Sequence, residues 1–326
     1  MVASQPKIQP ERQVSSQVSP VQARMVALLD KLAPQEGHTL APIDGVKFMR
    51  ATRSLPRMPV LYEPCIVVIA QGRKRGYLGD EVFPYDAQQF LVLAVPLPFE
   101  AETEASPEEP LLGISMRIDL KVAAELLLAL DEAGSYAQQM PKGICATPLD
   151  AKLGDAVVRL LDACTSPLDA KLLAPSILRE IYFRVLASEQ GGAIRAALTH
   201  QSQFGKIAKA LRRIHADYNG ALDVAKLADE AGMSVPAFHA NFKSVTQTSP
   251  IQYLKTTRLH KARLLMVQDG VTAAVASDRV GYESPSQFSR EFKRFFGRTP
   301  QEETRFMKNL LVEIPMEQSS RYVTVQ

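Results

Sequence analysis

The side chains that could carry chemistry are distributed unevenly along this chain of 326 residues. Residues 200–326 hold 18 lysines and arginines against 12 acidic residues, a net charge of +6, whereas residues 1–199 carry a net charge of −3. A basic excess on one part of a chain indicates a face that binds a polyanion such as nucleic acid. A solvated surface with a chance excess of charge is the alternative, so motifs must decide.

No motif predicts catalysis or a resident metal. Metal-dependent chemistry needs a cluster of histidines with a carboxylate, and His38 is the only histidine before His200. Cys65, Cys145 and Cys164 form an odd set without metal-ligand spacing, so we expect buried thiols rather than a disulfide framework or a zinc site. The sequence also lacks a Ser/His/Asp set and a glycine-rich phosphate loop. We therefore expect no enzyme, no metal and no cofactor.

Two weaker candidates for sensing a small molecule lie in the first half of the chain. Cys65 lies beside Pro64 in a predicted strand, where a reactive thiol could sense an electrophile or oxidant, but an apolar strand raises the pKa of a thiol and makes it inert. Arg73, Lys74 and Arg75 follow a glycine and could bind an anionic effector. A solvated basic loop is the alternative for these three residues.

The strongest pattern is an internal repeat in the basic part of the chain. Gly232 is matched by Gly281 at an offset of 49 residues. After a one-residue insertion, further pairs match at an offset of 50: Phe238 with Phe288, Phe242 with Phe292, Lys243 with Lys293, and Pro250 with Pro300. A repeat of this length is seldom a product of chance.

Each copy of the repeat predicts two helices joined by a turn. The turn glycine permits a left-handed backbone, Ser234 or Ser284 can cap the second helix, and two phenylalanines four residues apart anchor that helix inward. The opposite face of the second helix is left polar. This is helix-turn-helix geometry, in which the second helix enters the major groove of DNA.

A longer helix is predicted between the two copies, from about residue 250 to residue 268. One stripe of this segment holds Ile251, Leu254, Arg258, Ala262 and Leu265. Such a helix spans about 27 Å, comparable to the ~34 Å between major-groove faces one turn apart. One monomer could therefore contact two adjacent grooves.

These motifs resemble the double helix-turn-helix DNA-binding domain of AraC/XylS-type transcription regulators. The resemblance rests on RLHKARLL at residues 258–265, on VGYESPSQFSREFKRFFGRTP at 280–300, and on GMS at 232–234 with two Phe-led pairs that follow, Phe238-His239 and Phe242-Lys243. It covers about a third of the chain and is highly specific. It implies a sequence-specific regulator, in this family usually an activator, that binds double-stranded promoter DNA and RNA polymerase.

The resemblance also assigns roles to residues of both second helices. The candidate base contacts are Pro236, Ala237, His239, Ala240, Pro285, Ser286, Gln287, Ser289 and Arg290. Among them Arg290 could bind guanine and Gln287 could bind adenine, whereas the first helix offers few hydrogen-bonding groups. The candidate phosphate contacts, which position without specifying, are Lys243, Lys293, Arg294 and Arg298. A solvated surface position is the alternative for each single residue.

The first half of the chain has a different periodicity. Between about Ile43 and Leu120, short apolar runs alternate with proline and glycine, which predicts an antiparallel sandwich or barrel with a hairpin tip at Gly79-Asp80. The continuous apolar run at residues 66–70 indicates a strand buried on both sides, as in a small closed barrel. Beyond Asp119 three apolar stripes at helical spacing predict three helices.

This half is similar to the cupin-like, small-molecule-binding half found in one branch of the same family. The similarity rests on RMPVLYEPCIV at residues 57–67, AQGRKR at 70–75, VPLPFE at 95–100 and SPEEPLLG at 106–113. It implies an unknown small-molecule effector. The helices after the strands are expected to support a homodimer.

The expected organisation is a mixed fold in four parts. Residues 1–20 form a disordered arm, and residues 21–191 form a cupin-like effector-binding and dimerisation domain, an antiparallel β-barrel with flanking helices. Residues 192–310 form an all-α DNA-binding domain of two helix-turn-helix units joined by a long helix, and residues 311–326 form a tail. No apolar stretch is long enough for a membrane helix and the N-terminus has no signal-like apolar core, so we expect a cytoplasmic protein.

Two alternatives remain for the function. One is a cupin-fold enzyme for small molecules fused to a DNA-binding module, which the missing histidine cluster disfavours. The other is an architectural protein that binds DNA without sequence preference. The difference between the two second helices, of which only one carries Gln287 and Arg290, favours specific recognition.

Overall fold

The computed structural model describes residues 19–132, 143–188, 191–198 and 202–312. The expected arm and tail lie almost entirely outside this part of the chain, although Ser19 and Pro20 already belong to the start of a helix and the last helix reaches Val312. By their contacts the residues form two compact units. The N-terminal unit ends at Leu198, and the C-terminal unit holds the helices that follow together with two short segments, Met58–Glu63 and Val95–Pro98.

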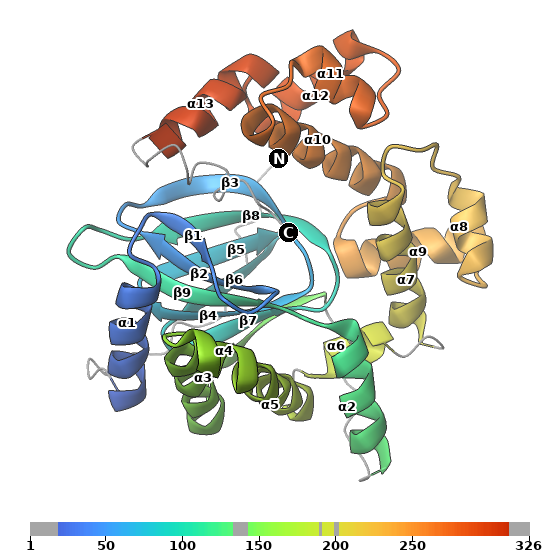
Figure 1. Cartoon of the computed structure of the whole chain (residues 1–326). Coiled ribbons are helices and arrows are strands. Elements are labelled where there is room, and N and C mark those ends of the chain that lie inside the picture. Colours follow the sequence, from blue (N-terminus) through green and yellow to red (C-terminus); the bar gives the residue numbers. More distant parts are fainter. Residues whose placement is uncertain (1–18, 133–142, 189–190, 199–201, 313–326) are drawn as a thin grey trace, which may run out of the picture. The chain divides into compact units, whose positions relative to one another are not determined.

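Strands of the first half of the chain form two sheets (Figure 1). The six-stranded sheet has the order β1-β2-β9-β4-β7-β10, with β1 Gly37–Leu40, β2 Val46–Ala51, β9 Leu111–Arg117, β4 Cys65–Gln71, β7 Gln89–Leu93 and β10 Ile144–Pro148. The four-stranded sheet has the order β3-β8-β5-β6, with β3 Leu55–Tyr62, β8 Leu97–Glu104, β5 Arg73–Leu78 and β6 Glu81–Asp86. The expected antiparallel domain is thereby confirmed.

The prediction that the strands close into a single barrel was wrong. Among the described strands, β1 and β10 are edges of one sheet and β3 and β6 are edges of the other. Strand β3 carries Pro56 and Pro59, whose nitrogens have no proton to donate, so this strand is suited to an edge. The sheets therefore pack as two layers rather than as a continuous cylinder.

The local features of the sheets follow the sequence closely. Cys65 to Ala70 of β4 are all buried, as the continuous apolar run predicts. The predicted hairpin tip is also confirmed: Leu78 of β5 faces Glu81 of β6, and Gly79 in the turn has a φ of 59°. A positive φ is readily adopted only by glycine.

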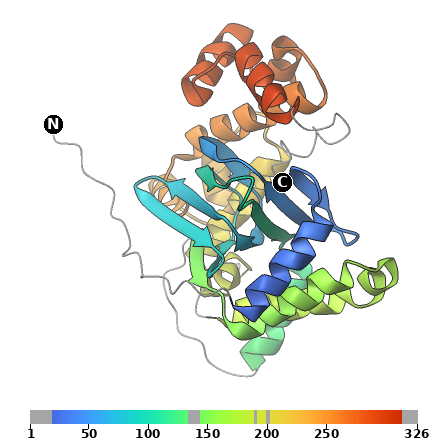
Figure 2. The same cartoon turned by 90° about the vertical axis from the view of Figure 1, so that its left-hand side faces the viewer.

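Six helices of the N-terminal unit are described: α1 Pro20–Leu32, α2 Leu120–Glu132, α3 Ala151–Ala163, α4 Pro167–Leu172, α5 Ala174–Ala187 and α6 Gly191–Leu198. Helix α1 packs against β4 and β9 and against α3, which in turn packs on α5, so these helices cover one face of the six-stranded sheet (Figures 1 and 2). The three predicted apolar stripes correspond to α2, α3 and α5. Helix α4 has only six residues, too few for a periodic pattern.

All the secondary-structure elements described after Ser202 in the C-terminal unit are helices. Its helices are α7 Gln203–Ala216, α8 Val224–Glu230, α9 Val235–Thr246, α10 Pro250–Gln268, α11 Ala273–Arg279, α12 Pro285–Phe296 and α13 Pro300–Val312. The predicted linking helix is α10, and its bounds are confirmed to the residue. At about 1.5 Å per residue its 19 residues span about 28 Å.

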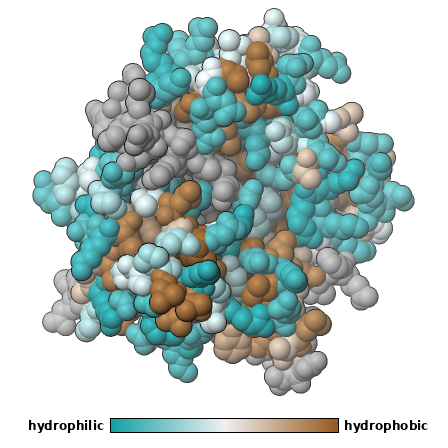
Figure 3. All heavy atoms as spheres, viewed as in Figure 1, coloured by the Kyte–Doolittle hydropathy of each residue, from teal (hydrophilic) through white to brown (hydrophobic). Residues whose placement is uncertain are grey.

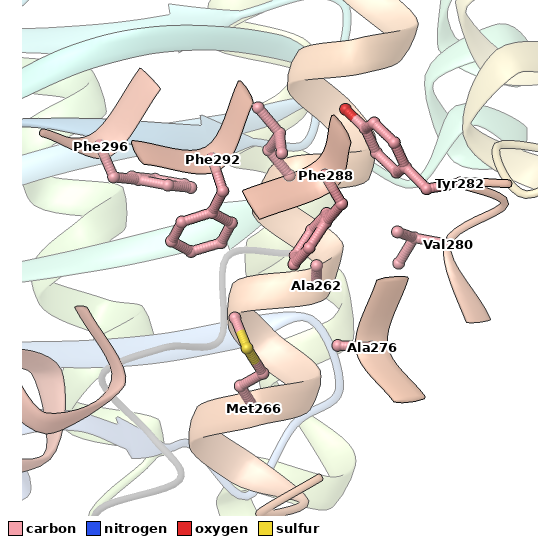
Figure 4. Close-up of a cluster of buried hydrophobic side chains, with 9 residues drawn as sticks. Ala262, Met266, Ala276, Val280, Tyr282, Phe288, Phe292 and Phe296 are labelled. Atoms are coloured by element: carbon pink, nitrogen blue, oxygen red, sulfur yellow. The ribbon is translucent and has the colours of Figure 1, made fainter. Parts of the chain in front are cut away.

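The core of the second half of this unit is aromatic (Figure 4). Phe288, Phe292 and Phe296 project from α12 onto Ala262 and Met266 of α10. Neighbouring phenylalanine rings of α12 lie with their centroids 5.4 Å and 4.5 Å apart. Because truncation of a buried phenylalanine costs about 3–5 kcal/mol, this cluster fixes the face that α12 turns inward.

Candidate nucleic-acid interface

The first helix-turn-helix unit consists of α8, a turn at Gly232 and α9. Gly232 has a φ of 60°, and the Ser234 hydroxyl accepts a hydrogen bond from the backbone nitrogen of Ala237 at 3.4 Å. Phe238 and Phe242 are fully buried. The predicted turn glycine, serine cap and aromatic anchors are all confirmed in this copy.

The second unit, of α11, a turn at Gly281 and α12, is built in the same way. Gly281 has a φ of 80°, and the Ser284 hydroxyl accepts from the backbone nitrogen of Gln287 at 3.3 Å. Phe288 and Phe292 are buried at 1% and 0% exposure. Both units therefore bury one face of their second helix by the same device, which leaves the opposite face for a partner.

The candidate base contacts lie on those opposite faces. On α9, Pro236, Ala237 and Ala240 are exposed and His239 is half-buried. On α12 the exposed candidates are Pro285, Ser286, Gln287 and Arg290, and Ser289 is half-buried. None of these residues is in the core. Four of the five candidate positions on α12 carry a hydrogen-bonding side chain. On α9 only one of the four candidate positions does, namely His239.

The candidate phosphate contacts differ among themselves. Lys243, Lys293 and Arg294 are exposed. Arg298 is held within the fold, because its Nη1 lies 3.2 Å from Glu303 Oε2 and its guanidinium carbon lies 3.8 Å from the centre of the Phe306 ring. Three of the four basic side chains are thus exposed, and the fourth, Arg298, is half-buried and ion-paired.

Glu291 lies beside the candidate base contact Gln287, and its role was not predicted from the sequence. Its carboxylate accepts hydrogen bonds from Lys255 Nζ at 2.7 Å, from the Tyr282 hydroxyl at 2.9 Å and from Gln287 Nε2 at 3.2 Å. Burial raises the pKa of Glu291, but these hydrogen bonds outweigh burial and lower it overall, so the group is ionised. The spacing of four residues between Gln287 and Glu291 on one helix is the signal that could have found the pair.

Arg258 of α10 is a second residue whose role was missed. Its Nε donates to the carbonyl oxygen of Tyr218 at 2.7 Å, Nη1 to that of Gly281 at 2.9 Å and Nη2 to that of Gly220 at 2.7 Å. The guanidinium joins the loop after α7 to the turn of the second unit. No local sequence pattern predicts that a side chain will bind main-chain carbonyl groups distant in the chain.

Two histidines of the C-terminal unit are structural and neutral. Burial lowers the pKa of His215 to about 4, with a further contribution from the charge of Lys261, and its Nε2 lies 2.7 Å from the Tyr253 hydroxyl. Burial also lowers the pKa of His260 well below its usual value, and its ring packs edge to face on Phe295 and Phe296. Neither histidine faces the solvent side of α9 or α12.

The weak effector candidates of the N-terminal unit have neighbours of their own. Arg73 lies 3.8 Å from Asp86 and 3.9 Å from Glu104, and Arg75 pairs with Glu102 at 3.6 Å and with Glu104. Lys74 is half-buried on the same strand. The ion pairs occupy two members of the basic cluster with protein carboxylates.

The cysteines are free thiols. Cys65 and Cys164 are buried and Cys145 is half-buried, and burial raises the pKa of Cys145 and of Cys164 to about 11. In the described ranges no three His, Cys, Asp or Glu side chains lie together in a way that could hold a metal ion. Of the helices with described residues, none combines the length and the apolar character needed to cross a membrane.

Comparison with known families accounts for both units. Residues 42–193 match the model of the AraC-type transcriptional regulator N-terminus, and residues 227–305 match a helix-turn-helix domain. The chain belongs to the AraC-type transcriptional regulators. The helix-turn-helix match spans both copies of the repeat, from Leu227 of α8 to Arg305 of α13.

Curated relatives of this AraC-type regulator include two bacterial proteins. The transcriptional regulator AlkR of Acinetobacter baylyi is 34% identical over 95 residues, 29% of this chain and 31% of AlkR. The RCS-specific transcriptional activator RclR of Escherichia coli is 37% identical over 82 residues, 25% of this chain and 29% of RclR. The chain thus matches about a third of the length of these relatives.

The regulator also shares its fold with a solved structure. ToxT of Vibrio cholerae, in a form with bound unsaturated fatty acid, superposes with a TM-score of 0.52 at 13% sequence identity, over 79% of this chain and 94% of ToxT. At this identity the likeness concerns the fold, a sheet-rich N-terminal part followed by helices of the helix-turn-helix class.

Proposed function

We propose that this AraC-type regulator binds a specific double-stranded DNA sequence by placing α9 and α12 in adjacent major grooves. The observation that carries the proposal is the shared construction of the two helices, each of which buries a matched pair of phenylalanines four residues apart and exposes the opposite face. A linking helix of about 28 Å is of the size needed to serve two grooves one turn apart.

Helix α12 is the main reader of sequence in this proposal. Arg290 donates two hydrogen bonds to guanine, Gln287 binds adenine, Ser286 and Ser289 contact the adjoining base edges, and Pro285 packs beside them. On α9, His239 supplies the hydrogen-bonding group, while Pro236, Ala237 and Ala240 offer apolar contact to thymine methyl groups.

Replacement of Arg290 by alanine tests this assignment. We expect the preference for guanine at one position of the selected site to fall by about five- to 150-fold, the value of one bidentate contact. Arg305→Ala removes the same charge from an exposed position of α13 and should weaken all sequences alike. Unchanged base preference after Arg290→Ala contradicts the assignment.

Lys243, Lys293 and Arg294 are the proposed phosphate contacts. Each releases about one counterion on binding, so replacing one by alanine should lower the slope of log affinity against log salt by about 1 and leave base preference unchanged. Arg298 is omitted from this set because Glu303 and Phe306 hold it.

The N-terminal unit is the proposed receptor for a small-molecule effector, which shifts the population of molecules able to bind DNA and RNA polymerase. Support comes from its match to the AraC-type N-terminus. Lys74 is the remaining basic candidate for an anionic effector, since Arg73 and Arg75 are ion-paired. The proposal places the protein in the compartment that holds its DNA target.

A homodimer through the helices of the N-terminal unit is part of the same proposal. Leu168 and Leu172 lie one turn apart on α4 with 64% and 63% exposure, and Leu173 follows with 52%. Figure 3 shows this apolar patch among polar surroundings over α4. Sedimentation of the protein with Leu168→Ser and Leu172→Ser should show a loss of dimer, and an unchanged mass contradicts this contact.

Genome-wide mapping of binding sites, followed by titration of the best site with and without competitor DNA, tests the function as a whole. Peaks at a few promoters with a shared motif, and binding that survives competitor, support a specific regulator. Diffuse occupancy without a motif contradicts it and favours an architectural DNA-binding protein. Turnover of a small molecule by the intact protein, with no promoter binding, would instead favour an enzyme.

A further inference from the structure

Two hydrogen bonds hold the side chain of Glu291 in addition to the one from Gln287. Lys255 approaches it from α10 with Nζ 2.7 Å from Oε1, and Tyr282 approaches it from the turn with its hydroxyl 2.9 Å from Oε2. The Glu291 side chain is only 13% exposed, and the Tyr282 ring is itself held edge to face on Phe288. The carboxylate therefore has a defined position on the rim of the solvent-facing side of α12.

A carboxylate in this position dictates which end of the Gln287 amide faces it. An ionised carboxylate can only accept hydrogen bonds, so the amide nitrogen of Gln287 must point toward Glu291, as the 3.2 Å contact records. One N–H is used in this bond. The second N–H and the carbonyl oxygen remain, and Gln287 is exposed.

We propose that Glu291 is the positioning residue that orients the Gln287 amide for adenine. Adenine presents in the major groove an acceptor, N7, beside a donor, the N6 amino group, and the free N–H and oxygen of a fixed glutamine amide match this pair. Glu291 contacts no base in this arrangement. The inference rests on the proposed function, since it requires that α12 enters the groove.

The first helix-turn-helix unit provides an internal comparison. At the positions that match Tyr282, Gln287 and Glu291 it has Met233, Ala237 and Asn241. Asn241 donates instead to the carbonyl oxygen of Ala237 in its own helix, at 2.9 Å. The orienting network thus belongs to α12, the helix with hydrogen-bonding side chains at four of its five candidate base contacts.

The test measures base preference separately from affinity. The full-length protein and its Gln287→Ala variant are each used to select sites from a randomised double-stranded DNA library. Four duplexes are then made that differ only at the base pair where Gln287→Ala relaxes the selection. In Glu291→Gln the new amide can either donate or accept, so the Gln287 amide loses its fixed orientation. We expect the preference for adenine to fall by about two- to tenfold, the value of immobilising one flexible side chain.

Three controls make the outcome decisive. Glu283→Gln removes the same charge from an exposed position next to the cap of α12, and should raise affinity for all four duplexes equally. Glu291→Gln in the Gln287→Ala background should leave base preference as in Gln287→Ala alone, because Glu291 acts through Gln287. Unchanged helical circular dichroism and binding of nonspecific DNA show that the variants are folded.

Each result has a defined reading. A drop in adenine preference that disappears in the Gln287→Ala background supports the inference. If Gln287→Ala changes base preference but Glu291→Gln does not, the positioning role is overturned while the proposed function stands. If Gln287→Ala has no effect on preference at any position, the assignment of Gln287 as a reader fails, and the inference fails with it.

Discussion

Arg258 of the linking helix donates a hydrogen bond to the carbonyl oxygen of Gly281, 2.9 Å away, and thereby ties α10 to the turn of the second helix-turn-helix unit. Its other two nitrogens bind the carbonyl oxygens of Tyr218 and Gly220 in the loop after α7. One planar guanidinium thus joins three segments. The guanidinium donates from three separate nitrogens in one plane, whereas the three N–H groups of a lysine ammonium all radiate from one atom.

Replacing Arg258 by lysine should therefore lower the free energy of unfolding. At least two charged hydrogen bonds are lost, so we expect a decrease of about 2–4 kcal/mol. Urea denaturation followed by circular dichroism measures it. Arg305→Lys, at an exposed position of α13, is the matched control and should change stability by less than about 0.5 kcal/mol. Equal stability of the two variants contradicts the role of Arg258.

Alanine substitutions at Gly281 and Gly297 distinguish the cost of a left-handed backbone from the cost of a steric clash. Both have a positive φ, 80° and 77°. A Cβ at Gly281 would lie 2.1 Å from the carbonyl oxygen of Asn219, whereas a Cβ at Gly297 meets nothing within 4 Å. Gly297→Ala should cost about 1–2 kcal/mol for the left-handed backbone alone. Gly281→Ala should cost clearly more in thermal denaturation, and a smaller or equal loss would show that the Asn219 loop can yield.

The Glu303 carboxylate holds two arginines that differ in burial. Its Oε1 lies 3.4 Å from Arg263 Nη1, and the two side chains are 3% and 4% exposed, whereas the Arg298 side chain is 43% exposed. Glu303→Gln leaves the charge of Arg263 buried and uncompensated, so we expect a loss of about 3–5 kcal/mol. Arg298→Ala should cost less, because the Arg298 side chain is partly solvated and Glu303 keeps Arg263 as its buried partner. Similar losses from both substitutions would contradict this ranking.

The buried histidines predict instability of the C-terminal unit in mild acid. Burial lowers the pKa of His215 to about 4 in the folded protein, while the unfolded chain takes up this proton near pH 6.5. Between these values the unfolded state binds more protons, so stability decreases as the pH falls from about 6.5 toward about 4. His260 contributes in the same direction.

Chemical denaturation at pH 7.5, 6, 5 and 4.5 measures this dependence. His215→Asn cannot take up the proton, so the decline with falling pH should be shallower in this variant, whatever its stability at pH 7.5. A slope equal to that of the unmodified protein would show that other groups, such as paired carboxylates, cause the acid sensitivity.

The repetitive and periodic features of this protein could be predicted from its sequence. Gly281, Ser284 and Phe288 occupy the turn, the cap and the core because each role requires one residue type at one spacing, which a repeat makes visible. The start of α10 follows in the same way from Pro250, but the predicted apolar stripe was wrong in part, because Ile251 is 53% exposed and the helix buries residues on more than one face.

Features that depend on contacts distant in the chain could not be predicted. Strand β10 follows residues 133–142 and pairs with β7, more than fifty residues earlier, and nothing local marks it as a strand. Whether two sheets close into a barrel depends on their edges, which a list of strands does not fix. Arg258 and Glu291 likewise act through residues that only the fold brings near.

The carbonyl acceptors of Arg258 also bear on how DNA specificity can diverge. Every amino acid supplies a main-chain carbonyl, so substitutions at Tyr218 or in the solvent-facing positions of α9 and α12 leave the acceptors of this junction in place. The junction that joins α10 and the loop before α8 to the turn of the second unit is thereby separate from the side chains proposed to read the bases. A lineage of such proteins can acquire new operator sequences by surface substitutions while the spacing between the two halves of the operator is inherited unchanged.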